Sequence, residues 1–174
     1  PGVRFGDDQW SYGSPRCIHI DTSSSCRLYF HRYTYPMKSG LGAGNVIISA
    51  ISTDGLDFNE EPGTRIAQET DRETYSVYAP EVLRLGDGSY RMYYAAWTED
   101  IAGGVFTATS NDGLIWQKDT QVCVDLGSPL DCNMVSEPCV IELADGRSRM
   151  FYEASDAEGS CRILSATSIS SDSG

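Results

Sequence analysis

The sequence predicts an all-β protein of the β-propeller type, built from three four-stranded antiparallel units called blades. Three observations carry this prediction. Residues 80–110 align with residues 138–168 at a constant shift and without a gap, and 12 of the 31 positions are identical. Each repeat alternates short apolar stretches with turns rich in Gly and Asp, as antiparallel sheets do. The chain also begins with what reads as the last strand of a repeat and ends without one, which is typical of a closed ring.

The second repeat, predicted over residues 75–118, has the clearest strand pattern. A Gly-Asp-Gly-Ser cluster at residues 86–89 separates two apolar and aromatic stretches and has the composition of a tight hairpin. The expected strands are residues 82–85, 90–96, 103–110 and 114–117. Pro80 stands at the start of the first strand and marks the equivalent point of every repeat.

The first repeat is predicted over residues 14–60, with Pro15 at the position of Pro80. It carries six more residues than the second repeat between its second strand and its last turn. We place them in the Gly- and Pro-rich segment 34–44, which is expected to be an exposed loop that borders a site.

The third repeat is predicted over residues 135–174, with Pro138 at its start and no fourth strand at its end. Residues 1–13 resemble the end of a repeat, because an acidic turn precedes Trp10. They are expected to complete a third blade. Three blades are too few for a ring, which usually has four to eight. Either two chains meet as a homodimer with six blades, or this chain is part of a longer one.

Composition limits the classes of partner. The formal net charge is −12, which disfavours nucleic acid and anionic membranes. There is no run of about 18 apolar residues and no charged-then-apolar signal segment at the start. The two histidines lack metal-ligand spacing, and calcium loops and phosphate-binding glycine motifs are absent. We therefore expect no metal, no cofactor, no nucleic acid and no membrane partner.

The six cysteines include no pair spaced as CxxC. Cys123 and Cys132 flank the loop before the third repeat, where a local disulfide can form. The other four are expected to be small buried hydrophobes within strands; they are Cys17, Cys26, Cys139 and Cys161.

Candidate chemistry lies beside the repeated prolines. The first strand of each blade lines the central channel of a propeller, so Arg16, Glu81 and Glu137 are expected to face one cavity. Two carboxylates there can serve glycoside hydrolysis, one protonated as general acid and one ionised. The competing interpretation is structural: both glutamates accept backbone N–H bonds or pair with arginine at the strand ends.

Residues 78–97 and 136–154 resemble blades of the five-bladed propeller glycosidases, the clan of arabinanases, β-xylosidases, fructosidases and mannoside phosphorylases. In that clan an acidic residue beside proline opens the inner strand of a blade. Glu81 follows Ala-Pro and Glu137 precedes Pro, so the resemblance implies that one is the general acid and the other a base or transition-state stabiliser. The clan uses three acids, whereas the first repeat has Arg16 and no carboxylate beside Pro15.

Further side chains are predicted to bind a saccharide. Aromatic faces at strand ends stack on sugar rings, and imidazoles hydrogen-bond sugar hydroxyls. The candidates are Tyr33, Tyr78, Trp97 and His19, with Arg16 at the channel. Two functions stay open: a glycoside hydrolase with Glu81 and Glu137 as its acid/base pair, or a non-catalytic carbohydrate- or ligand-binding propeller.

Asp54 and Asp112 belong to Ser-x-Asp-Gly turns that resemble the Asp boxes of sialidase-like propellers. There the Asp caps the turn and a following Trp packs between sheets. Both aspartates, together with Trp10 and Trp116, are expected to be structural.

Overall fold

The computed structural model describes residues 10–20, 24–100 and 103–169, and the described residues form eleven strands and no helix. The all-β prediction is confirmed. No described segment is a helix long and apolar enough to span a bilayer. The strands are β1 (Ser11–His19), β2 (Cys26–Tyr33), β3 (Val46–Ser52), β4 (Asn59–Glu60), β5 (Ser76–Arg84), β6 (Tyr90–Trp97), β7 (Val105–Ser110), β8 (Gln117–Lys118), β9 (Met134–Glu142), β10 (Ser148–Ser155) and β11 (Cys161–Thr167).

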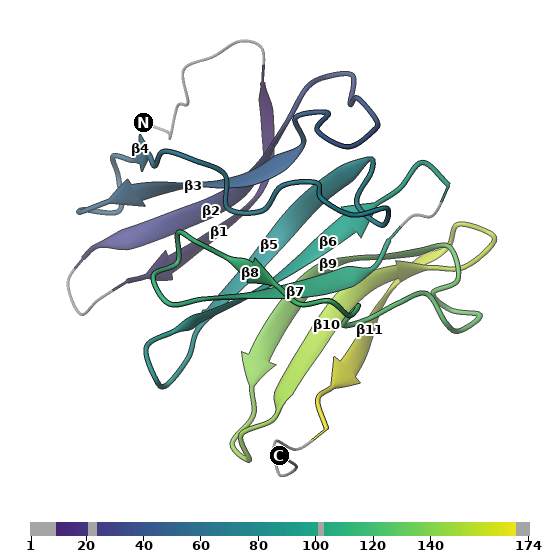
Figure 1. Ribbon diagram of the computed structural model, residues 1–174. Coiled ribbons are helices and arrows are strands. Elements are labelled where there is room, and N and C mark those ends of the chain that lie inside the picture. The colour runs from purple at the N-terminus through teal and green to yellow at the C-terminus, as the bar shows by residue number, and fades with distance from the viewer. Residues whose placement is uncertain (1–9, 21–23, 101–102, 170–174) are drawn as a thin grey trace.

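The strands form three antiparallel sheets in chain order. The first sheet is β1-β2-β3-β4, the second is β5-β6-β7-β8 and the third is β9-β10-β11. Figure 1 shows the three sheets following one another across the molecule, from β1–β4 at the upper left to β9–β11 at the lower right. Every connection within a sheet joins neighbouring strands, which is the meander of a propeller blade.

Several strand boundaries differ from the sequence prediction: β5 begins at Ser76 rather than at residue 82, and β7 begins at Val105 rather than at residue 103. The fourth strand of the second sheet is only Gln117–Lys118, because Asp112 ties residues 114–115 into the preceding turn. β1 begins at Ser11 rather than residue 14, and Ser11 pairs with Tyr33. Ser11–Gly13 therefore belong to the innermost strand of the first sheet. The rest of the strand predicted over 1–13 lies outside the described residues.

The polar segments between the repeats also contribute to the sheets. Ile66 bridges Ile47 at the start of β3, and Val124 bridges Val105 at the start of β7. Ile47 and Val105 are 58 residues apart, as are Ile66 and Val124, so the repeat continues into the segments between the predicted repeats. Ile66 is buried in the core, which anchors the chain as it crosses to the next sheet.

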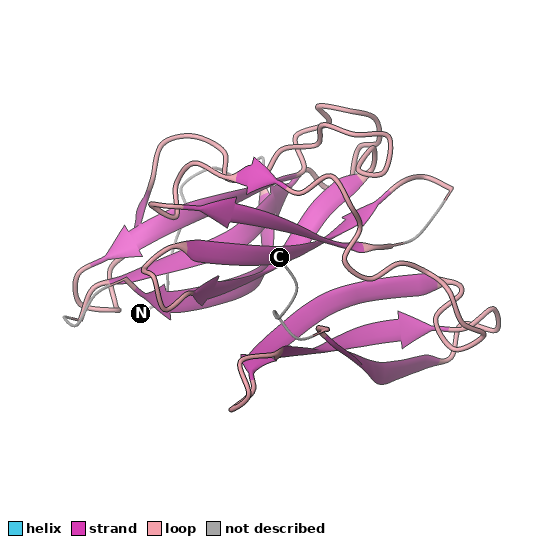
Figure 2. Ribbon diagram, turned by 60° about the horizontal axis from the view of Figure 1, so that its bottom comes forward, coloured by secondary structure: helices cyan, strands magenta, loops and turns pink. Residues whose placement is uncertain are grey.

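The core lies between neighbouring sheets, as expected where sheets pack face to face. Figure 2 shows the third sheet lying alongside the rest of the molecule. One cluster joins the first and second sheets and includes Tyr29, Ile47, Val82 and Met92. A second cluster joins the second and third sheets through Val105, Val135, Val140, Met150 and Tyr152.

The Asp-box turn at Asp112 joins the second sheet to the first. Asp112 Oδ1 accepts hydrogen bonds from the backbone N–H groups of Leu114 and Ile115, at 2.8 and 2.9 Å. The same turn then accepts a bond from Tyr29 Oη through the Gly113 carbonyl, at 2.9 Å. Trp116 packs edge-on against Tyr29. Asp54 caps its turn in the same way, so the structural role predicted for Asp54, Asp112 and Trp116 is confirmed.

A buried carboxylate fixes the segment before β5. Glu73 is 1% exposed and accepts bonds from Lys118 Nζ at 2.8 Å and Tyr94 Oη at 2.9 Å. Its Oε2 also accepts the backbone N–H groups of Glu69 and Thr70. A buried charge is tolerated when it is paired and its oxygens are hydrogen-bonded, and Glu73 meets both conditions.

Candidate functional site

The same backbone irregularity interrupts the innermost strand of each sheet. Ser14, Ala79 and Glu137 have φ values of 47°, 50° and 46°, and each stands directly before a proline. Strand pairing is broken at the same place in all three sheets. Positive φ costs a residue with a Cβ atom about 1–2 kcal/mol, and a following proline restricts it further. A strained bulge retained in every repeat is a feature that tertiary packing enforces.

The three bulges meet around one small cavity. It has a volume of about 220 Å³ and is lined by residues 14–16, 79–81 and 137–139. Each sheet thus contributes the proline and the two residues beside it. The structure therefore brings Arg16, Glu81 and Glu137 to one place.

Glu81 joins all three sheets at this cavity. Its side chain is 3% exposed, and Oε1 accepts a bond from Arg16 Nη2 at 2.6 Å. The same oxygen accepts the backbone N–H of Val140 at 3.2 Å. Burial raises the pKa of the Glu81 carboxyl, and the bonds from Val140 and Arg16 oppose that rise. Both structural roles that competed with catalysis, pairing with arginine and accepting a backbone N–H, are found at Glu81.

Glu137 is the more accessible of the two carboxylates. It is exposed, and its Oε1 accepts a bond from Ser14 Oγ at 3.3 Å, across the cavity from the third sheet to the first. No described arginine or lysine forms an ion pair with it. Partial burial raises its pKa, and the negative charge of Glu153 raises it further. A carboxyl with this property holds a proton at higher pH than an ordinary glutamate.

Glu153 was not predicted from the sequence. It lies on β10 opposite Ser136, whose Oγ is 3.5 Å from Glu153 Oε2. In the aligned second repeat the same position is Ala95, within a stretch that is otherwise strongly conserved between the two repeats. This difference between the two repeats is the sequence feature that could have identified Glu153. The equivalent position in the first sheet is His31, opposite Gly13, so each of the three sheets carries a different side chain here.

An aromatic row runs from the first sheet to the second beside the cavity. His31 stacks on Tyr33 with ring centroids 5.1 Å apart and meets Tyr78 edge-on at 5.9 Å. Tyr78 meets Trp97 edge-on at 5.8 Å, and Trp97 stacks on Tyr75 at 6.4 Å. The structure thus brings together Tyr33, Tyr78 and Trp97 as predicted side chains, with His31 and Tyr75 added.

The two histidines have different environments. His31 packs against Gly13, and burial lowers its pKa to about 4, so it is a neutral ring within the aromatic row. His19 is exposed at the far end of β1, where it pairs with Cys26. β1 runs from the row to that far end, so His19 does not join the other predicted sugar-binding residues.

All six cysteines are free, so Cys123 and Cys132 form no disulfide in this structure. Cys26 is buried as predicted, whereas Cys17, Cys139 and Cys161 are exposed, contrary to the prediction. Cys139 occupies the position after proline that holds Arg16 and Glu81 in the other repeats. Among the described residues no group of His, Cys, Asp and Glu side chains has the arrangement of a metal site.

Comparison with known sequences finds two similar curated proteins, and no protein-family model matches the chain. The uncharacterised protein MT1551 of Mycobacterium tuberculosis strain CDC 1551 is 33% identical over 181 residues. The uncharacterised protein Rv1502 of strain H37Rv is 32% identical over the same length. Each alignment covers 97% of this chain and 55% of the relative, so the chain spans about half the length of the curated relatives it matches.

Comparison with solved structures finds glycoside hydrolases. Zg3597, a family 117 glycoside hydrolase of Zobellia galactanivorans, superposes with a TM-score of 0.75 at 19% identity, over 94% of this chain and 54% of that one. An endo-arabinase of Bacteroides thetaiotaomicron gives 0.68 at 16% identity, over 96% and 59%. A thermostable family-43 glycoside hydrolase gives 0.66 at 16%, over 91% and 48%. The chain therefore shares the fold of these glycoside hydrolases, as the sequence resemblance implied; a count of five blades does not follow.

Proposed function

We propose that this chain is part of a carbohydrate-active propeller that binds a saccharide at the central cavity and cleaves a glycosidic bond there. The observation that carries the proposal is Glu137. It is exposed at a cavity built by three sheets, has no described cationic partner, and has a raised pKa. The shared fold with glycoside hydrolases supports the reaction class.

In this proposal Glu137 acts as the general acid. Its protonated carboxyl gives a proton to the glycosidic oxygen as the bond from that oxygen to the anomeric carbon breaks. Glu153 helps to keep the proton on Glu137 at higher pH. The Ser14 hydroxyl, 3.3 Å from Glu137 Oε1, orients the carboxyl.

The reaction also needs a second carboxylate, to act as base or nucleophile on the opposite side of the sugar. Glu81 is bound to Arg16 and Val140, and we assign it to holding the three sheets around the cavity. The second carboxylate then comes from outside these three sheets.

Two assemblies can supply it. A second copy of the chain would close a six-bladed ring as a homodimer, or further blades of a longer protein would close the ring. Light scattering distinguishes them: a homodimer has twice the chain mass of 19.0 kDa, whereas a piece of a longer protein remains at the monomer mass.

The test of function compares Glu137→Gln with Glu81→Gln on 4-nitrophenyl glycosides of arabinose, xylose and galactose. We expect Glu137→Gln to lower turnover by about 10²–10⁴-fold, the usual contribution of a general acid, while the saccharide still binds. Turnover that is unchanged in Glu137→Gln would exclude this role.

A second candidate function is a non-catalytic saccharide-binding propeller. The ion pair between Arg16 and Glu81 favours it, because a cation at the equivalent position of the first repeat neutralises one of the two predicted carboxylates. This function predicts saccharide binding with no turnover of any glycoside, and affinity that depends on aromatic residues rather than on Glu137.

A further inference from the structure

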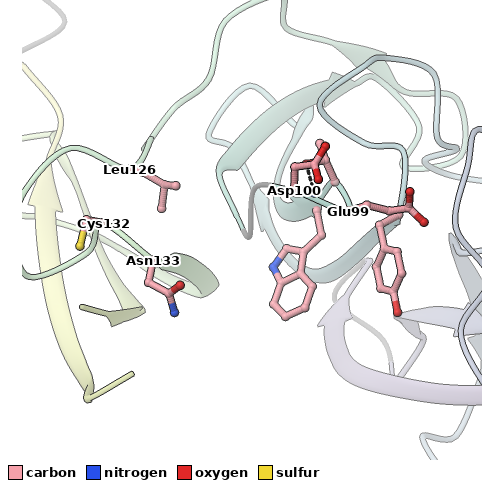
Figure 3. A pocket seen from close by; sticks show the side chains of 8 residues that line it. Glu99, Asp100, Leu126, Cys132 and Asn133 are labelled. Carbon is pink, nitrogen blue, oxygen red and sulfur yellow. Dashed lines mark hydrogen bonds between the residues drawn. The ribbon is translucent and has the colours of Figure 1, made fainter. Parts of the chain in front are cut away.

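A second and larger hollow opens between the second and third sheets. Its volume is about 660 Å³, three times that of the central cavity. Tyr75, Trp97, Glu99 and Asp100 line one side from the second sheet, and Leu126, Cys132 and Asn133 line the other. Figure 3 shows Glu99 and Asp100 on one side of the gap and Leu126, Cys132 and Asn133 on the other.

We propose that this hollow is a subsite for the extended part of an oligosaccharide, and that it accepts neutral or amino sugars rather than uronates or sulfated sugars. The inference rests on the proposed function, because it assigns where the rest of a saccharide bound at the central cavity lies.

The aromatic side chains give the hollow a surface for a sugar ring. Tyr75 and Trp97 stack with centroids 6.4 Å apart and planes inclined by 30°. Sugar rings pack their C–H faces on such aromatic surfaces.

The polar lining determines the class of sugar. Glu99 and Asp100 are exposed carboxylates, which accept hydrogen bonds from hydroxyl or ammonium groups. Asn133 gives one N–H to Ser155 Oγ at 2.9 Å, so its amide oxygen and remaining N–H are held in place at the rim. Among the residues that the structure describes, no arginine or lysine lines the hollow. An anionic sugar would face two carboxylates without a counter-charge.

The hollow lies close enough to the central cavity for one ligand to reach both. Trp97 pairs with Ser76 at the start of β5, and the bulge at Ala79 is three residues farther along that strand. Three residues of strand span roughly 10 Å. Asn133 likewise directly precedes β9, whose bulge is at Glu137. Tyr78 lies between the two sites and contacts Trp97 edge-on.

The experiment measures affinity by calorimetry for saccharides of two lengths on the purified protein. The probes are arabinobiose and arabinohexaose, xylobiose and xylohexaose, and a hexamer of galacturonic acid. The variants are Tyr75→Ala and Trp97→Phe, the latter keeping an aromatic ring if Trp97→Ala fails to fold. Tyr35→Ala is the matched control, because Tyr35 is 84% exposed and does not line the hollow.

We expect a neutral hexamer to bind the wild-type protein about tenfold more tightly than its dimer, and Tyr75→Ala to remove that advantage while leaving dimer affinity unchanged. Tyr35→Ala should leave both affinities unchanged. The uronate hexamer should bind only after Glu99→Gln and Asp100→Asn are combined.

Three results would overturn the proposal in distinguishable ways. If the dimer and hexamer bind equally well and Tyr75→Ala changes neither, the hollow is not a subsite, although saccharide binding at the central cavity stands. If the uronate hexamer binds the wild-type protein best, the assigned sugar class is wrong. If no saccharide binds at all, the proposed function fails together with the subsite.

Discussion

Arg16 Nη2 lies 2.6 Å from Glu81 Oε1, so a guanidinium of the first sheet neutralises a carboxylate that the second sheet buries. The two residues occupy equivalent positions, one after the proline of each repeat. The same carboxylate accepts the Val140 N–H of the third sheet. One glutamate thus connects the inner strands of all three sheets.

The first prediction concerns this pair. Removing one partner of a fully buried ion pair costs about 3–5 kcal/mol. Because Arg16 is 39% exposed, we expect Arg16→Met to lower the free energy of unfolding by roughly 2 kcal/mol in urea denaturation at pH 7. Arg72→Met is the matched control, since Arg72 pairs with an exposed Asp125, and it should cost less than about 1 kcal/mol.

The Arg16→Met effect should also depend on pH. The pKa of Glu81 is already raised by burial, and loss of Arg16 raises it further. A carboxyl with a raised pKa favours the folded state below its unfolded pKa, and this contribution is lost as pH rises through the folded pKa. The variant should therefore be closer to wild type at pH 4 than at pH 7. An equal loss at both pH values would contradict a buried, uncompensated Glu81.

The second prediction tests the strain at Ala79, which has a φ of 50° before Pro80. Glycine adopts this conformation freely, whereas a β-branched residue does so only at high cost. We expect Ala79→Gly to change the free energy of unfolding by less than about 1 kcal/mol, and Ala79→Val to lower it by at least about 2 kcal/mol. Equal destabilisation by both would mean that the buried methyl, and not the backbone, controls this position.

The third prediction concerns the proton on Glu137. Burial and the charge of Glu153 raise its pKa. If Glu137 is the general acid, activity falls as pH rises through that pKa. Glu153→Gln removes a negative charge, lowers the pKa of Glu137, and should shift the alkaline limb of the kcat/KM profile to lower pH. Glu158→Gln, at an exposed turn of the same sheet, should leave the limb in place.

The fourth prediction follows from His31, whose pKa burial lowers to about 4 from an ordinary 6.5. Between these two pH values His31 is protonated in the unfolded chain but neutral in the folded protein, so the free energy of unfolding decreases as pH falls from 6.5 to 4. The loss should be on the order of 3 kcal/mol. His31→Gln should flatten this part of the pH–stability curve, whereas His19→Gln should not, because His19 is exposed. A slope that persists in His31→Gln would point to other groups.

The inner strands and the cavity residues could be predicted from the sequence, because short local motifs mark each repeat. The prolines, the Asp-Gly turns and the internal repeat predicted three sheets and placed Arg16, Glu81 and Glu137 beside the prolines, Arg16 and Glu81 after theirs and Glu137 before its own. The positive φ values were not readable, because Ser14 and Glu137 are residues that ordinarily avoid this conformation. Packing between sheets imposes it.

The roles of the carboxylates also depend on contacts that no local pattern records. The sequence does not distinguish the roles of Glu81 and Glu137. Only in the folded chain does Arg16 pair with Glu81, and only there does the charge of Glu153 act on Glu137. His19 and His31 likewise lie in strands of the same repeat, but β1 directs His19 away from the aromatic row that contains His31. Partners distant in the chain decide these assignments.

The three bulges have one more consequence. The φ values of Ser14, Ala79 and Glu137 before their prolines are nearly the same, so the bulge does not depend on which of these side chains it carries. The residue before proline can therefore carry a hydroxyl, a methyl or a carboxyl group while the backbone of the strand keeps the same conformation. A duplicated sheet can in this way gain or lose a reactive group by a single substitution, and the chemistry of the cavity can change while its backbone is retained.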